Sequence, residues 1–487
     1  MPFNSISFII LFPAVVVFYY LVPKKIRHVW LALISLVFYL FAYQDMGFVV
    51  ILLIMSGVTY ISGIALSNID STVLKKLVFV LTLVIELGVL FTFKYLDFTL
   101  GLAGSSLRLS LAMPVGMSFY MFQAISYLTD VYRGDISCEY NPVKMILYLS
   151  FFLTIVSGPI NRAGDILPQF SAAPGPSLER AKRGMQKMLW GYFLKLAIAG
   201  RLAIIVDRVY ADTASFSGGC IALAALSYMF MLYCDFEGYS QIAIGSGYIL
   251  GLKMKENFRQ PFFSLSMSEM WRRWHVSLSS WFRDYLYIPL GGNRKGIVRK
   301  YVNIFIVLFL SGVWHGANMT FFVWGALNGA FIILGQLLLP GRDRLAVSLK
   351  DKLCKSETSR LTFDRVREVI KRIGVYILIS FTFIFFANDS VSSAALAVRS
   401  IFTGSSPASF AGDIGRLGIG RLNLVMSAVM VVFVFIADGA ANKRSCDTPG
   451  VIKRIPTPLR WVIYYALLIA ILFSANLTGK EFVYSRM

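Results

Sequence analysis

Long apolar runs separated by short polar segments fill the chain of 487 residues. A run of about 18 or more apolar residues has the length of a helix that crosses a bilayer. Here the runs are continuous rather than alternating, which predicts an all-α polytopic membrane protein and excludes a β-barrel. Because some runs fit re-entrant or tilted helices, we expect about 11 to 13 tilted transmembrane and re-entrant helices. The candidate segments are 3–22, 28–43, 47–67, 75–96, 113–131, 143–159, 185–209, 218–234, 239–252, 302–316, 318–339, 373–388, 422–438 and 459–475.

These helices are expected to form one integral membrane domain over residues 1–487. Within it we distinguish N-terminal transmembrane helices at 1–109, a catalytic core at 110–390 and C-terminal transmembrane helices at 391–487. No internal repeat is visible in the sequence, which weakens the case for a transporter built from two inverted halves.

The charge of the chain fits a membrane topology. Lys and Arg number 47 against 26 Asp and Glu, so the formal net charge is +21. Basic loops on the cytosolic side and beside anionic lipid explain this charge better than nucleic acid does, and no nucleic-acid partner is expected. The stretches 24–27, 75–76, 341–372 and 443–460 are therefore expected in the cytosol, with 389–420 as an extracytoplasmic loop.

The run 3–22 has no basic residue before it, so we expect no cleavable signal peptide and an extracytoplasmic N-terminus. The cysteines are scattered and odd in number, which predicts neither a disulfide framework nor a metal site. No Gly-rich nucleotide loop is present either. The cysteines are Cys138, Cys220, Cys234, Cys354 and Cys446.

Residues 266–284 predict a helix lying in the plane of the membrane interface. Ser266 followed by Glu269 is a capping-box pattern that begins a helix. At about 100° per residue, an aromatic face forms beside a basic, hydroxyl-bearing stripe. His275 falls on the border between the two, a place suited to an anionic group such as a phosphate. The face comprises Trp271, Trp274, Leu278, Trp281 and Phe282, and the stripe Arg272, Ser279 and Arg283.

A second histidine, His315, is predicted at a break between two helices. The apolar run 301–339 is too long for one span of about 20 residues. It should break near 312–318, where glycines flank the histidine, and Asn318 follows one turn later. An ionisable residue at membrane depth is a functional-site hypothesis by default. A neutral imidazole in such surroundings can accept a proton.

An ordered set of motifs over most of residues 110–390 resembles the membrane-bound O-acyltransferases. Within them it is similar to the bacterial polysaccharide O-acetylation branch, typified by the alginate O-acetylation membrane protein. Each motif alone is weak, whereas the ordered set is specific. The motifs are PVGMSF at 114–119, QAISY at 123–127, DVYRG at 130–134, SGPINR at 157–162, YCDFEGYS at 233–240, ENF at 256–258, WRRWH at 271–275, RDYLYIPLGGNR at 283–294 and WHGA at 314–317.

The resemblance implies a ring of tilted helices around a thinned centre with a tunnel, in a bacterial inner membrane. The family's two signature histidines fall on His275 and His315. The implied activity is transfer of an acyl group, expected to be acetyl, from acetyl-CoA or another cytosolic thioester toward hydroxyls of an exported polysaccharide such as alginate. Transfer is direct or passes through a periplasmic acyltransferase or polysaccharide-modification partner. Membrane lipids and a cytosolic acyl carrier are further expected partners, and no permanently bound cofactor is expected.

The sequence departs from the family pattern at a few positions. Asn328 stands where this branch often has His, and Glu237 and Gln241 replace the commoner Ser and Asp. The stretch 385–388 lacks the Arg that usually follows its aromatic pair. These changes leave both histidines intact, so they bear on the acceptor more than on the reaction.

Acyl transfer from a thioester needs a base for the hydroxyl and a group that stabilises the oxyanion. His315 is the candidate base, with a packing histidine as the alternative. His275 is a candidate to polarise the donor carbonyl or to pass the proton on, with an interfacial histidine as the alternative. The arginines are candidates for donor phosphates, or snorkel to the interface. Candidates for substrate and donor binding are Trp271, Arg272, Arg273, Trp274, Arg283, Asn318, Asp235, Asn161 and Arg162.

Other polar residues in apolar segments have structural explanations too. Asp235 and Glu237 are expected to pair with a buried cation. Cys234 is disfavoured as a covalent acyl carrier because no base is evident beside it. Candidate cations are Lys195, Arg201 and Arg133, and Ser118, Ser126 and Ser240 suit helix contacts as well as catalysis.

Three functions therefore remain open. The first is acetylation of an exported polysaccharide. The second is D-alanyl or acetyl transfer to teichoic acid, peptidoglycan or cellulose. The third is a non-catalytic conduit for acyl groups, which a variant lacking His315 would distinguish from an enzyme.

Overall fold

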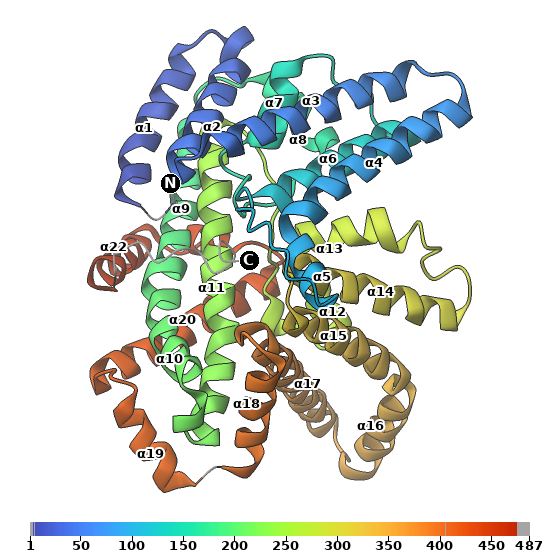
Figure 1. Ribbon diagram of the computed structural model, residues 1–487. Helices are drawn as coiled ribbons and strands as arrows, with labels where there is room; N and C mark the ends of the chain where they lie inside the picture. The colour runs from blue at the N-terminus through green and yellow to red at the C-terminus, as the bar shows by residue number, and fades with distance from the viewer. Residues whose placement is uncertain (1–2, 4, 405, 475–487) are drawn as a thin grey trace. The chain divides into compact units, whose positions relative to one another are not determined.

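The structure, a computed structural model, describes residues 3, 5–404 and 406–474. In this described part every regular element is a helix, and ten helices are long and apolar enough to cross a membrane. The prediction of an all-α polytopic membrane protein is confirmed. Contacts divide the chain into two compact units, the first within residues 1–197, 235–256 and 457–487 and the second within 198–234 and 257–456 (Figure 1). The sequence-based division at residues 109 and 390 stays a prediction.

In the first unit, α3 and α6 pack on each other and both contact α4 and α7, and α2 packs on α7. The described helices of this unit are α1 (Ile6–Leu21), α2 (Arg27–Tyr43), α3 (Met46–Asn68), α4 (Thr72–Lys94), α5 (Leu96–Leu102), α6 (Met117–Arg133), α7 (Pro142–Ser150), α8 (Ala163–Ala172), α9 (Leu178–Tyr192) and α22 (Thr457–Ser474), with residues 235–250 of α11 (Gly218–Leu250).

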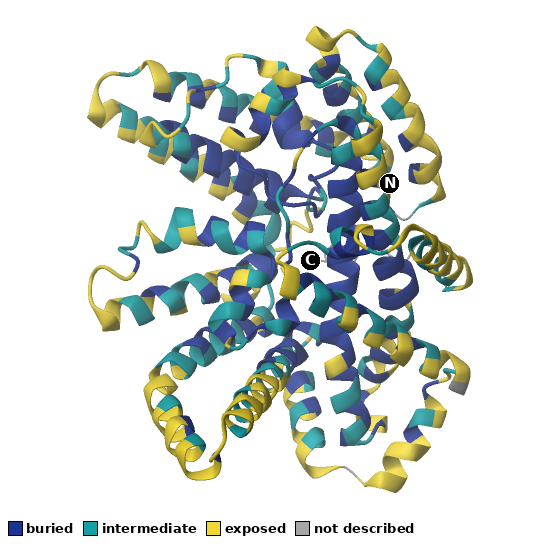
Figure 2. Ribbon diagram, turned by 180° about the vertical axis from the view of Figure 1, so that it is seen from behind, coloured by how far each residue is buried: buried dark blue, intermediate teal, exposed yellow. Residues whose placement is uncertain are grey.

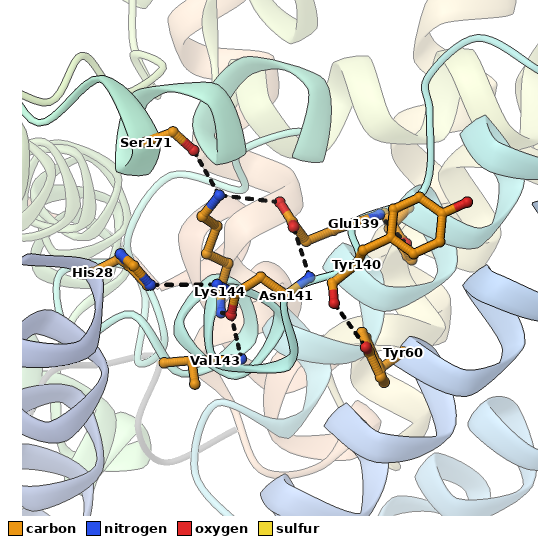
Figure 3. A network of polar contacts seen from close by, with 9 residues as sticks. His28, Tyr60, Glu139, Tyr140, Asn141, Val143, Lys144 and Ser171 are labelled. Atoms are coloured by element: carbon orange, nitrogen blue, oxygen red, sulfur yellow. Dashed lines mark hydrogen bonds and ion pairs between the residues drawn. The ribbon is translucent and has the colours of Figure 1, made fainter. Parts of the chain in front are cut away.

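A polar network fixes the start of α7 (Figure 3). Asn141 is its N-cap, and its side-chain oxygen accepts hydrogen bonds from the backbone N–H groups of Val143 (2.9 Å) and Lys144 (3.2 Å). The amide nitrogen of Asn141 lies 3.4 Å from Nε2 of His28. Capping of this kind satisfies backbone donors that a helix leaves unpaired. His28 therefore belongs to a structural network.

In the second unit, α14 and α15 pack closely through glycines. A Cβ on Gly325 would lie 2.6 Å from the carbonyl oxygen of Leu308, and a Cβ on Gly312 would overlap the carbonyl oxygen of Phe321. Helix α15 also packs on α12 and α17. The described helices of this unit are α10 (Gly200–Ala211), α12 (Met267–Arg273), α13 (Val276–Phe282), α14 (Ile297–His315), α15 (Met319–Leu337), α16 (Leu339–Leu353), α17 (Glu357–Ala387), α18 (Val391–Thr403), α19 (Pro407–Arg416), α20 (Arg421–Arg444) and α21 (Thr448–Lys453), with residues 218–234 of α11.

The expectation of separate spans at 218–234 and 239–252 is wrong, because one helix, α11, covers both. Asp235 and the polar residues after it interrupt the apolar run in sequence. In the structure the carboxylate of Asp235 pairs with the ammonium of Lys195. A buried charge that has its partner does not have to end a helix.

Two segments expected as loops are helical. The basic stretch 341–372 forms most of α16 and the start of α17, and Lys350 pairs with Asp364 at 2.6 Å. The segment 389–420 contains α18 and α19. A search for apolar runs predicts membrane spans, but it misses helices built from charged residues or from small ones such as Ser, Gly and Ala.

Many residues along several long helices are exposed (Figure 2), and large apolar ones are among them. On α4, for example, Val73 is 78% exposed and Val84 is 62% exposed. Apolar surface of this extent fits contact with lipid chains. It agrees with a multi-pass membrane protein.

Candidate active site

The helix expected over 266–284 is interrupted at His275. α12 ends and α13 begins on either side of this residue, whose φ of +43° is left-handed. That backbone region is uncommon for residues other than Gly. Ser266 does cap the first helix as expected, accepting a hydrogen bond from the backbone N–H three residues on (3.1 Å). The aromatic residues therefore do not share one helical stripe.

The segment around Asn257 holds this turn from both sides. The backbone oxygen of Asn257 accepts a hydrogen bond from the N–H of Val276 (2.8 Å), and its side-chain oxygen accepts one from the hydroxyl of Ser277 (2.7 Å). Two residues on, the N–H of Arg259 donates to the carbonyl oxygen of Arg273 (3.0 Å). Asn257 is fully buried. These contacts set the position of His275.

His275 is 1% exposed, so its expected place on the border of an interfacial helix is wrong. The break turns its imidazole into the interior of the second unit, where its ring centre lies 6.4 Å from that of Trp314. Burial lowers the pKa of His275 to about 3. The imidazole is therefore neutral at any physiological pH.

His315 lies at the predicted break between α14 and α15, and this prediction is confirmed. It is the last residue of α14, and Asn318 begins α15 by accepting a hydrogen bond from the N–H of Thr320 (3.0 Å). The amide of Asn318 also donates to the carbonyl oxygen of Asp389 (2.8 Å). The histidine is 4% exposed.

Aromatic rings surround His315. Their centres lie between 4.9 and 6.3 Å from that of the imidazole. Trp314 contacts both histidines, so the second unit brings His275 and His315 into one aromatic cluster. The rings around His315 are Trp314, Phe321, Trp324 and Phe386. An imidazole in its neutral form can accept a proton from a bound hydroxyl.

Two of the aromatic candidates join the same cluster. Trp271 packs on Trp324 with ring centres 5.5 Å apart. Trp274 packs on Phe258 at 4.8 Å and on Phe383 at 5.9 Å. The sequence-based grouping of these tryptophans with the histidines therefore agrees with their positions, although their role stays a prediction.

The three arginine candidates differ in their surroundings. Arg273 pairs with Glu269 (2.7 Å) and donates to the side-chain oxygen of Asn442 (2.6 Å). Its contacts are those of a structural residue. Arg272 is exposed, and Arg283 is exposed and paired with Asp284 (2.8 Å).

The remaining candidates belong to the first unit. Asp235 pairs with Lys195, which is the structural explanation expected for it. The side-chain oxygen of Asn161 accepts a hydrogen bond from the N–H of Lys255 (3.0 Å), and Arg162 is buried beside it in sequence. Within the described chain, no group of three His, Cys, Asp or Glu side chains is placed to hold a metal ion.

Comparison with known proteins gives the chain a family. Residues 133–346 match the family described as membrane-bound O-acyltransferase. A Pseudomonas syringae protein named "Probable alginate O-acetylase AlgI" is 30% identical over 480 residues, which cover 94% of this chain and 88% of that protein. The chain belongs to the membrane-bound O-acyltransferase family.

Two other relatives have names that refer to other polymers. A peptidoglycan O-acetyltransferase of Helicobacter pylori is 32% identical over 331 residues, 62% of each chain. A teichoic acid D-alanyltransferase of Streptococcus thermophilus is 26% identical over 278 residues, 52% of this chain and 66% of that one. The protein is accordingly an O-acyltransferase.

Sequence reasoning missed the part that α20 plays in this O-acyltransferase. Asp438 accepts hydrogen bonds from the hydroxyls of Tyr233 (2.7 Å) and Thr448 (2.9 Å), and the Tyr233 ring lies 6.4 Å from that of Trp274. One turn on, Asn442 binds Arg273. Helix α20 thus braces the residues that precede His275. An ionisable residue inside the apolar segment 422–438 was the available signal.

The left-handed turn makes a prediction about His275. His275→Asn should stay folded, because Asn tolerates positive φ, while its acyl transfer falls. His275→Val should fold in lower yield, since a β-branched residue is strained at this φ. Size-exclusion profiles and thermal midpoints in detergent measure the difference. Equal stability of the two variants would show that the turn does not need this backbone conformation.

Proposed function

We propose that this O-acyltransferase moves an acetyl group from a cytosolic thioester to hydroxyl groups of an exported polysaccharide of the alginate type. The observation that carries the proposal is His315, a buried ionisable side chain at a helix break inside an aromatic cluster. The similarity to an alginate O-acetylase over 94% of the chain supports the acetyl group and the polysaccharide. An intramembrane ionisable residue of this kind is more often functional than structural.

In the proposed reaction, His315 is the general base. A ring nitrogen takes the proton of the attacking sugar hydroxyl while the hydroxyl oxygen bonds to the thioester carbonyl carbon. The electron pair of the carbonyl moves to its oxygen and forms a tetrahedral oxyanion. Collapse of this intermediate reforms the carbonyl and breaks the C–S bond. The thiolate then takes the proton back from His315, leaving an ester and a thiol.

His275, whose ring also lies near Trp314, assists. Its neutral imidazole, buried in the same cluster, can donate one hydrogen bond and so orient the thioester carbonyl. Its low pKa keeps it from competing for the proton that His315 takes. In this proposal the second histidine therefore positions the donor and leaves proton transfer to His315.

The donor is acetyl-CoA or another acyl thioester that arrives from the cytosol. Both enter as substrates, and a cytosolic acyl carrier would deliver the second kind. The proposed location is the bacterial inner membrane with the N-terminus outside, as the basic loops indicate. A tunnel through the second unit is a further part of the proposal. Transfer to the sugar hydroxyl is direct in this proposal, and a periplasmic transferase is not required for it.

A second candidate is D-alanyl transfer to teichoic acid. It is supported by the 26% identity to a teichoic acid D-alanyltransferase. The same base chemistry applies to both, so the two proposals differ in donor and acceptor alone.

Inverted membrane vesicles distinguish these proposals. Vesicles containing the protein are given acetyl-CoA labelled in its acetyl group outside and alginate oligosaccharides inside. We expect base-labile label on the enclosed oligosaccharide with the wild type and none with His315→Ala. Transfer that occurs only from a D-alanyl carrier thioester to a teichoic acid acceptor would replace the first proposal with the second. Vesicles that transfer neither group would overturn both.

A further inference from the structure

Two indole N–H groups are buried in the cluster around His315. Trp324 is 1% exposed and Trp271 is 9% exposed. In the described part of the chain, neither Nε1 atom has an acceptor within hydrogen-bond distance. A buried donor without an acceptor is costly, and such donors are rare in native structures. Two of them in one cluster therefore need an explanation.

One indole packs on the base, the other packs on that indole, and the two come from different helices. The Trp324 ring, on α15, stands at 89° to the His315 imidazole with centres 5.0 Å apart. The Trp271 ring, on α12, packs against Trp324 at 5.5 Å and 72°. Helices α12 and α15 contact each other directly. Trp271 is thus linked to His315 through the ring of Trp324.

One face of α15 repeats the pattern. Thr320 and Asn328 lie one turn before and after Trp324, and all three are at most 1% exposed. In the described chain, Thr320 Oγ1 and Asn328 Oδ1 also have no hydrogen-bond partner. Side chains at this spacing share a helix face. A polar substrate bound along this face would supply the hydrogen-bond partners that these side chains lack.

We propose that the indole N–H groups of Trp271 and Trp324 form the oxyanion hole of this transferase. The inference rests on the proposed acyl transfer and adds the residues that stabilise its intermediate. Each indole donates a hydrogen bond to the thioester carbonyl oxygen as that oxygen takes the electron pair of its double bond. Both bonds weaken again when the carbonyl reforms and the C–S bond breaks.

Indole chemistry fits this task. An indole nitrogen is a donor only and does not ionise at physiological pH, so it cannot compete with His315 for the hydroxyl proton. Rings locked by packing hold their N–H groups where negative charge develops, without reorganisation during the reaction. The packing of Trp324 against His315 places the oxyanion donor next to the base.

The test replaces each indole N–H by sulfur and keeps the ring shape. Site-specific 3-benzothienylalanine at position 324 or 271 removes the donor. We expect kcat to fall about 100- to 1000-fold at each position, with KM for the donor close to that of the wild type. The same replacement at Trp461, which is 53% exposed on α22, is the control and should leave kcat unchanged. Trp324→Phe gives a second variant made from natural amino acids.

A second readout needs no acceptor. With acetyl-CoA carrying ¹³C at its carbonyl, donated hydrogen bonds lower the carbonyl stretching frequency in the wild type. Each benzothienyl variant should shift that frequency back upward. Unchanged kcat and frequency in folded variants would overturn the oxyanion hole while leaving the acyl transfer in place. A lower kcat with an unchanged frequency would assign the tryptophans a packing role and also overturn it. A wild type that neither transfers acetyl nor shifts the carbonyl would overturn the proposed function and this inference together.

Discussion

Cells that produce the His315→Ala variant should export polysaccharide without base-labile acetyl esters. Loss of a general base lowers the rate by about 10²- to 10⁴-fold, enough to remove the modification from a growing culture. His315 is the last residue of α14, and its imidazole lies among four aromatic rings. The acetyl content of purified polysaccharide measures the effect, alongside the amount of folded protein in the membrane.

The matched control for this variant is His28→Ala. His28 lies in the polar network at the start of α7 (Figure 3) and belongs to the first unit, whereas the aromatic cluster belongs to the second. We expect its replacement to leave acetylation near the wild-type level. Normal acetylation in cells that contain folded His315→Ala protein would show that His315 is not the general base.

Gly325→Val should lower the amount of folded protein strongly. A Cβ at this position would lie 2.6 Å from the carbonyl oxygen of Leu308, a backbone atom that cannot move aside alone. Helices α14 and α15 would have to separate, and this overpacking costs about 1–3 kcal/mol or more. The separation also displaces His315 from its cluster. Thermal midpoints in detergent and acyl transfer should fall together.

Gly335→Ala is the control in the same helix. A Cβ at Gly335 would meet nothing within 4 Å, so this variant should fold as the wild type does or slightly better. Replacing a helical Gly by Ala stabilises by about 0.4–1 kcal/mol when the site has room. If Gly325→Val were as stable as Gly335→Ala, the close approach of α14 and α15 would not be required for the fold.

The break at His315 was accessible from sequence, whereas the turn at His275 was not. Glycines beside His315 in an apolar run too long for one span mark the break by local signals alone. The turn at His275 depends on hydrogen bonds that Asn257, far back in the chain, accepts from Val276 and Ser277. Local periodicity continues through residues 266–284, so only the folded chain reveals the break.

Whether a charged residue can be buried inside a helix also depends on partners far away in the chain. Asp235 interrupts an apolar run, and that interruption suggested two helices where α11 is one. Its partner Lys195 lies 40 residues earlier. Sequence analysis named this pair among the options, yet it could not tell that the pair leaves the helix unbroken. The brace that Asp438 provides through Tyr233 is another long-range contact of this type.

The arginine candidates also show where local sequence signals differ from the folded structure. A basic stripe beside His275 is expected from Arg272, Ser279 and Arg283, and the break between α12 and α13 separates Arg272 from the other two. Arg273 forms an ion pair with Glu269 and donates a hydrogen bond to Asn442. Helical periodicity places Arg272 and Arg283 beside one face, and this assignment holds only while the helix is continuous.

A single-turnover experiment with purified protein in liposomes tests the central claim most directly. Labelled acetyl donor is bound to wild-type protein and to His315→Ala, an excess of oligosaccharide acceptor is added, and ester is quantified after rapid quenching. We expect both proteins to bind the donor and only the wild type to form ester within the time of one turnover. Ester formation by His315→Ala at the wild-type rate would contradict the account.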